Sequence, residues 1–138
     1  MSFQLPKFFA NRPPQTEAEH QLVVMTFCRT HPDDRLKFMF HIPNGGGRSK
    51  REASELKSIG VKSGVSDLFL PVMAIGNDGL VRGGLWIEMK CPGGRQSEEQ
   101  IKWIYDMRRN GYEARIAFGW EEAVEIIREY IGEKGDVA

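Results

Sequence analysis

The sequence predicts a three-layer α/β/α domain with a central mixed sheet, and three observations carry this prediction. Segments with helical and with strand periodicity alternate along the chain in the order helix, strand, helix, hairpin, helix, strand, helix. A length of 138 residues suits one domain and is too short for two hydrophobic cores. Hydrophobic residues make up 41% of the chain and charged residues 28%, which is usual for a globular protein.

Capping signals predict where three of the helices begin. Each start is a Ser or Thr followed three residues later by Glu or Gln, which is the pattern of a capping box. The pairs are Thr16 with Glu19, Ser49 with Glu52, and Ser97 with Gln100. We expect these helices to end near Thr30, at Gly60 and at Asn110. The last helix is predicted from the apolar face formed by Ala123, Val124, Ile127 and Ile131.

Side chains that alternate between apolar and polar predict the strands. In residues 35–42 this alternation places Leu36, Phe38, Phe40 and Ile42 on one face. Further strands are expected at 65–70, 85–90 and 112–118, and a hairpin turn is expected at Gly76-Asn77-Asp78-Gly79.

The charges are balanced in number but not along the chain. The net charge is zero, yet residues 41–62 carry five Lys or Arg against two acids, and seven acids face three bases from residue 113 onward. A basic middle with an acidic end suits a molecule with one anion-binding face, and an ordinary mixed surface explains it equally well. Cys28 and Cys91 form no metal-binding pattern, and no apolar run approaches the roughly 20 residues that span a bilayer. We therefore expect a cytoplasmic protein with reduced thiols and no membrane contact.

Three charged residues near strand ends indicate catalysis. In the strand from Leu85 to Lys90, alternation puts Glu88 and Lys90 on the same face. A surface ion pair would explain these two alone. Asp67, however, opens an apolar strand, where a carboxylate is costly unless it is paired or bound to metal.

If the two strands are neighbours, Asp67 and Glu88 can share one divalent cation. Oxygen ligands with open positions suit Mg²⁺ or Mn²⁺. Such an ion polarises a phosphodiester and lowers the pKa of a bound water. Lys90 would then hold the attacking water or stabilise the charge that develops on the phosphate.

These residues and their flanks resemble a known nuclease family. Asp67 followed after a 20-residue gap by Glu-Met-Lys at 88–90 is similar to the PD-(D/E)xK signature, although Ser66 stands where that signature has Pro. The order and spacing of NGGG at 44–47, GVKSGVSDL at 60–68, WIEMK at 86–90 and GGRQSEEQ at 93–100 resemble the VRR-NUC family over roughly residues 16–127. The resemblance implies a restriction-endonuclease-like fold and divalent-metal-dependent cleavage of DNA, often of branched or flapped DNA.

The resemblance also implies which residues form the site. Asp67, Glu88 and Met89 would bind the metal, and Lys90 would act beside them. A further acid is expected on the first helix, where we favour Glu17 over Glu19 because Glu19 has a capping role. The resemblance points to Glu17 and to Gln21 at i+4. Gln100 is associated with the active site in the family, although its capping role with Ser97 would explain it as well.

A glycine-rich loop before the second helix is a candidate DNA contact. It lacks the spacing of a P-loop. Backbone N–H groups and basic side chains there could contact phosphates, and a mobile surface loop is the alternative. His41, at the end of the strand beside this loop, could touch the substrate or serve as a plain surface residue. The candidate DNA-binding residues are Asn44, Gly45, Arg48, Lys50 and, from the later glycine pair, Arg95.

The predicted organisation is an N-terminal arm (1–15), a VRR-NUC nuclease domain (16–131) and a flexible acidic tail (132–138). The apolar arm could pack on its own core or on a second subunit. Two function hypotheses remain: a Mg²⁺- or Mn²⁺-dependent endonuclease acting on branched DNA, such as a Holliday junction or a flap, and a non-catalytic nucleic-acid-binding module with the same fold. Coordinated cutting of a junction needs two active sites, so we also expect a homodimer.

Overall fold

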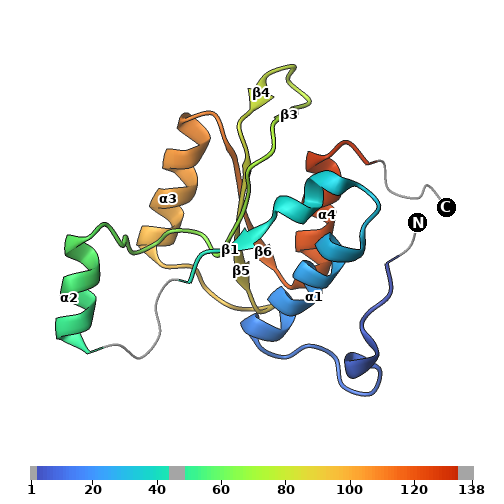
Figure 1. Cartoon of the computed structure of the whole chain (residues 1–138), viewed down its shortest axis with the longest axis horizontal. Coiled ribbons are helices and arrows are strands. Elements are labelled where there is room, and N and C mark those ends of the chain that lie inside the picture. Colours follow the sequence, from blue (N-terminus) through green and yellow to red (C-terminus); the bar gives the residue numbers. More distant parts are fainter. Residues whose placement is uncertain (1–2, 44–48, 134–138) are drawn as a thin grey trace.

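The protein, described here by a computed structural model over residues 3–43 and 49–133, is a mixed α/β domain (Figure 1). Its sheet has four strands in the order β1-β2-β5-β6. β1 pairs antiparallel with β2, β2 antiparallel with β5, and β5 parallel with β6. The central mixed sheet is therefore confirmed. The strands are β1 (Phe40–His41), β2 (Leu68–Leu70), β5 (Leu85–Lys90) and β6 (Glu113–Phe118).

Helices cover both faces of the sheet, which confirms the three layers. α1 (Glu17–Thr30) and α4 (Trp120–Tyr130) pack together and against β5, and α3 (Glu98–Arg109) packs against β5 and β6. Figure 1 shows α1 and α4 on one side of the sheet and α3 on the other. The main core lies on the α1–α4 side, where Leu85, Ile87 and Met89 of β5 are buried.

Two elements stand away from this body in Figure 1. α2 (Lys50–Ser58) contains no buried residue. The hairpin of β3 (Ala74–Ile75) and β4 (Val81–Arg82) forms a separate two-stranded sheet around the predicted turn. No helix among the described residues is long and apolar enough to cross a membrane.

The strand predicted at 35–42 is wrong for most of its length. Residues Asp34–Phe38 form a 3-10 helix, η2, and only Phe40–His41 are strand. The Asp33 carboxylate accepts the Arg35 N–H at 3.0 Å and so caps the helical turn. The buried residues are Leu36 and Met39, three apart, which is the spacing of a 3-10 turn and not of a strand.

The predicted caps form, but only one is a full capping box. Thr16 accepts the Glu19 N–H at 3.1 Å, while the Glu19 carboxylate pairs with Arg12 at 2.9 Å. Ser49 likewise caps α2 by accepting the Glu52 N–H. At α3 both halves are present, because Ser97 accepts the Gln100 N–H and Gln100 accepts the Ser97 N–H. Gly60, with φ of 108°, follows α2 at the predicted position.

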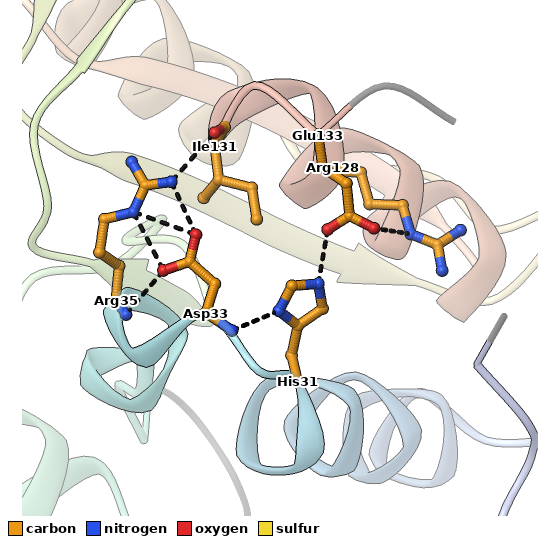
Figure 2. A network of polar contacts seen from close by, with 6 residues as sticks. All are labelled: His31, Asp33, Arg35, Arg128, Ile131 and Glu133. Atoms are coloured by element: carbon orange, nitrogen blue, oxygen red, sulfur yellow. Dashed lines mark hydrogen bonds and ion pairs between the residues drawn. The ribbon is translucent and has the colours of Figure 1, made fainter. Parts of the chain in front are cut away.

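The first and last described residues, Phe3 and Glu133, both contact the α1–α4 layer. Phe3, which precedes the 3-10 helix η1 (Lys7–Phe9) in the arm, packs edge-on against Phe27 and Trp120. At the other end, Glu133 contacts His31 at 2.5 Å and Arg128 at 3.6 Å (Figure 2). The arm thus contacts its own core, and residues 134–138 of the predicted tail lie outside the described residues.

Candidate active site

Antiparallel pairing of β2 and β5 brings the two predicted carboxylates together. Leu68 pairs with Ile87 and Phe69 with Trp86, so the next pair along the same register is Asp67 with Glu88. Residues directly opposite each other point to the same face. The Met89 N–H donates to Asp67 Oδ2 at 2.8 Å and fixes the Asp67 side chain against β5. The condition that the sequence could not test, that the two strands are neighbours, is therefore met.

Gly64 allows the chain to deliver Asp67 to this position. Its φ of 84° lies in the left-handed region, and a Cβ there would sit 2.6 Å from the Glu99 carbonyl oxygen. The segment before β2 thus crosses the first turn of α3 at a distance that only glycine permits. Ser66, which stands where the PD-(D/E)xK signature has Pro, is buried.

Glu88 is a buried carboxylate whose two oxygens differ. The residue is 3% exposed. Oε1 accepts a hydrogen bond from Gln100 Nε2 at 2.6 Å and lies 3.7 Å from Lys90 Nζ. Oε2 is buried and has no hydrogen-bond partner among the described residues. A buried acceptor without a partner is costly, which makes this oxygen a candidate ligand atom.

The electrostatics of the pair favour a positive partner. Burial raises the pKa of Glu88, and the neighbouring charge of Asp67 raises it further, while Lys90 acts in the opposite direction. Burial also raises the pKa of Asp67, against the effect of the Met89 hydrogen bond. Two facing carboxylates that resist ionisation become favourable as anions when a cation joins them.

The structure brings Glu17, and not Glu19, to this site. Glu17 Oε1 lies 3.9 Å from Lys90 Nζ, on the first turn of α1. Glu19 instead pairs with Arg12. The Lys90 ammonium therefore stands between Glu17 and Glu88, and its side chain is only 12% exposed. α1 is held in place by His20, whose Nδ1 accepts the Trp120 N–H at the start of α4 at 3.1 Å.

The residues present fit a hard divalent cation. Among the described residues, no three or more His, Cys, Asp or Glu side chains are grouped so that they could hold a metal ion by themselves. Mg²⁺, however, is commonly held by one or two carboxylates and completes its shell with water and substrate phosphate. Asp67 and the orphaned oxygen of Glu88 supply such a pair. The Met89 side chain is buried in the core, so any part that Met89 takes in metal binding falls to its main chain.

The predicted DNA contacts are less well defined. Lys50 begins α2 and Arg95 precedes α3, and both are exposed. Among the described residues, neither of them forms a hydrogen bond or ion pair with Asp67 or Glu88, whose partners are Met89, Gln100 and Lys90. Asn44, Gly45 and Arg48 lie outside the described residues.

Two contacts of the site could not be predicted from the sequence. The sequence offered capping and the active site as alternatives for Gln100, but one side chain does both: its oxygen caps α3 while its nitrogen holds Glu88. The capping pattern signalled only the first contact. His41 Nδ1 lies 2.9 Å from the Asp67 carbonyl oxygen, so this histidine braces the start of β2. The pairing of β1 with β2, which creates that contact, is not visible in the sequence.

A mixed sheet with facing carboxylates and a lysine at one end, between helical layers, has the layout of a nuclease-type domain. The sequence profile of the VRR-NUC domain matches residues 18–119, and the chain belongs to the VRR-NUC family. Among solved structures, one described as a VRR_NUC domain protein is similar, with 30% identity and a TM-score of 0.72. That match covers 86% of this chain and 89% of the other. No curated protein gives a significant match.

Proposed function

We propose that this nuclease-type domain is a Mg²⁺- or Mn²⁺-dependent endodeoxyribonuclease. One observation carries the proposal: the buried Glu88 carboxylate faces Asp67 and leaves Oε2 without a partner among the described residues. A binding module has no need of such a costly arrangement. A catalytic cation site does, because the cation gives both carboxylates a partner.

Each residue of the site has a task in phosphodiester hydrolysis. Asp67 and Glu88 would hold the cation, which supplies polarisation of the phosphodiester and a bound water of lowered pKa. Gln100 fixes the orientation of Glu88 through Oε1. Lys90 points its ammonium into the same space, where it holds the attacking water or stabilises negative charge that develops on the phosphate. Glu17 orients Lys90 from the opposite side.

The finer part of the proposal concerns the substrate and the assembly. Each chain carries one such site and would nick one strand, so coordinated cleavage of branched DNA, such as a four-way junction or a flap, calls for a homodimer with two-fold symmetry. Light scattering should then report about 31 kDa, twice the chain mass of 15.7 kDa. The exposed basic side chains of Lys50 and Arg95 support contact with DNA. A cytoplasmic location stays a prediction.

The test is nicking of supercoiled plasmid and of labelled flap, fork and four-way junctions, with Mg²⁺, with Mn²⁺ and with chelator. We expect cleavage only with metal, and preference for branched substrates. Glu122→Gln, on the exposed side of α4, is a matched control that should cleave normally. A protein that shifts DNA on a gel but never cleaves it would instead be the non-catalytic binding module.

A further inference from the structure

Three aromatic side chains form a row across the sheet beside the carboxylates. Phe40 of β1 pairs with Phe69 of β2, and Phe69 pairs with Trp86 of β5. Residues paired in this way share one face of the sheet. The ring centroids of Phe40 and Phe69 are 6.0 Å apart, and those of Phe69 and Trp86 are 4.2 Å apart. We call Phe40, Phe69 and Trp86 the aromatic row.

The row and the carboxylates belong to the same surface. Asp67 lies two residues before Phe69, and Glu88 lies two residues after Trp86, so all four side chains point to the same face. Along the strands, the Asp67–Glu88 pair is separated from the Phe69–Trp86 pair by two residues, or about 6.6 Å. A ligand that reaches Asp67 and Glu88 along this face therefore meets the aromatic row next.

The inner part of the row is rigid and its outer end is open. Trp86 is covered by Trp103 of α3 at 5.3 Å between centroids. A Cβ at Gly84 would lie 2.7 Å from the Phe69 ring, so glycine at that position lets the ring rest on β5. α3 packs over β5 and β6, and at the other edge Phe40 remains 47% exposed. The open ring of Phe40 is thus backed by a fixed aromatic stack.

We propose that the aromatic row stacks an unpaired base of the DNA strand that enters the site, through the open ring of Phe40. The inference rests on the proposed nuclease function in that the strand reaches Asp67 and Glu88. Aromatic rings bind exposed bases of any sequence, whereas the bases of an intact duplex already stack on one another. Exposed Lys50, Lys57 and Lys62 in and after α2, which lies on the α3 side of the sheet in Figure 1, supply charge that attracts the strand.

A second copy of the chain is the competing occupant of this face. β1 is a two-residue edge strand, too short to extend the sheet into another subunit by more than a few hydrogen bonds. The row is also continuous with the carboxylates, so a subunit seated on it would stand beside the entrance to the site. These two features favour nucleic acid over a partner protein.

The experiment measures binding without metal, so cleavage plays no part. Short single strands carrying the fluorescent base 2-aminopurine at successive positions are titrated with the full chain in chelator, beside a duplex of the same sequence. The wild-type protein should quench the fluorescence of a base at one position in the single strand and bind the duplex more weakly. Phe40→Leu, which keeps apolar bulk but removes the ring, should weaken binding about 5- to 100-fold, and Phe40→Trp should restore it.

Phe8→Leu is the matched control, because Phe8 is a 72% exposed phenylalanine in the N-terminal arm, away from this face. It should bind like the wild type. The inference is overturned if the wild-type protein quenches 2-aminopurine at none of the positions. It is also overturned if Phe40→Leu, with the melting temperature of the wild type, binds the single strand as tightly as the wild type does. A result in which Phe40→Leu only converts a dimer to a monomer overturns it as well.

The outcomes for the two proposals separate. A protein that binds single strands through Phe40 but never cleaves DNA keeps this inference and loses the nuclease. A protein that cleaves DNA with metal, and whose single-strand binding ignores Phe40, keeps the nuclease and loses this inference.

Discussion

The two faces of β5 differ in what their side chains need. On one face Leu85, Ile87 and Met89 are fully surrounded by the apolar core of α1 and α4. On the other face Trp86 contacts Trp103 of α3 and Glu88 contacts Gln100 of α3, and Glu88 keeps an oxygen with no partner among the described residues. Lys90, at the end of this face, lies near Glu17 at the start of α1. One strand of six residues thus has a fully packed apolar face and a polar face with an unsatisfied hydrogen-bond acceptor.

The contrast separates stability from function within one strand. The core face gains free energy from burial and tolerates no polar atom. The other face gives up free energy to keep two carboxylates near each other, and nothing in the packing of α3 requires that. A cost of this kind at one end of a sheet is typical of a functional site.

The largest effect should come from the polar face. Asp67→Asn and Lys90→Met should each lower the rate of plasmid nicking by about 100- to 1,000-fold, because one removes a metal-binding charge and the other removes the ammonium near the phosphate. Both variants should keep the circular dichroism spectrum of the wild type. Nicking at the wild-type rate by either variant would contradict this assignment of the site.

The core face should respond in the opposite manner. Ile87→Ala should lower the free energy of unfolding by about 2–5 kcal/mol, because the side chain is fully buried and leaves a cavity. Urea denaturation measures this change. Below the unfolding transition its nicking rate should stay close to that of the wild type. A large loss of rate in the folded variant would show that the two faces are not independent.

Gln100 joins the helix cap to the polar face, and Ser97 is its matched control. Ser97→Ala and Gln100→Ala should each destabilise the protein by about 0.5–2 kcal/mol, since each removes half of the capping box. Only Gln100→Ala releases Glu88, so only it should also slow cleavage, by about tenfold on the value of one hydrogen bond to a charged group. Equal nicking rates in the two variants would reduce Gln100 to a cap.

The smallest effect separates the two glutamates of α1. Glu17→Gln should slow nicking several-fold, because its charge lies 3.9 Å from Lys90 in a partly exposed place where screening weakens it. Glu19→Gln should leave the rate unchanged, since its partner is Arg12 on the surface. Steady-state nicking of plasmid by the two variants, measured side by side, decides the matter. If Glu19→Gln nicks more slowly than Glu17→Gln, then Glu19, and not Glu17, is the glutamate of α1 that faces the active site.

The sequence predicted an element most accurately where the alternation of its side chains alone determines its structure. β5 was expected from Leu85 to Lys90 and has those bounds, because strict alternation with a buried face leaves little choice. Residues 35–42 alternate as well, yet Asp33 caps a 3-10 turn there, and a local hydrogen bond outweighs the pattern. Phe38, expected on the same face as Leu36, is exposed as a result, whereas Leu36 is buried.

The site itself was predictable in its residues but not in its contacts. An acid that opens an apolar strand and a Glu-x-Lys on a second strand identify Asp67, Glu88 and Lys90 as candidates. That Gln100 divides its amide between a cap and Glu88, or that Gly64 clears α3, depends on distances between segments far apart in the chain. Local patterns contain no information on such distances.

Binding of Mn²⁺ to the metal-free protein, measured by calorimetric titration of the wild type and of Glu88→Gln, tests the central claim most directly. Glu88→Gln keeps the shape of the side chain and removes the charge that burial disfavours. The account predicts saturable binding by the wild type, and a matching rise in melting temperature, both lost in Glu88→Gln. Binding of equal strength by both proteins, or by neither, would contradict a cation site between Asp67 and Glu88.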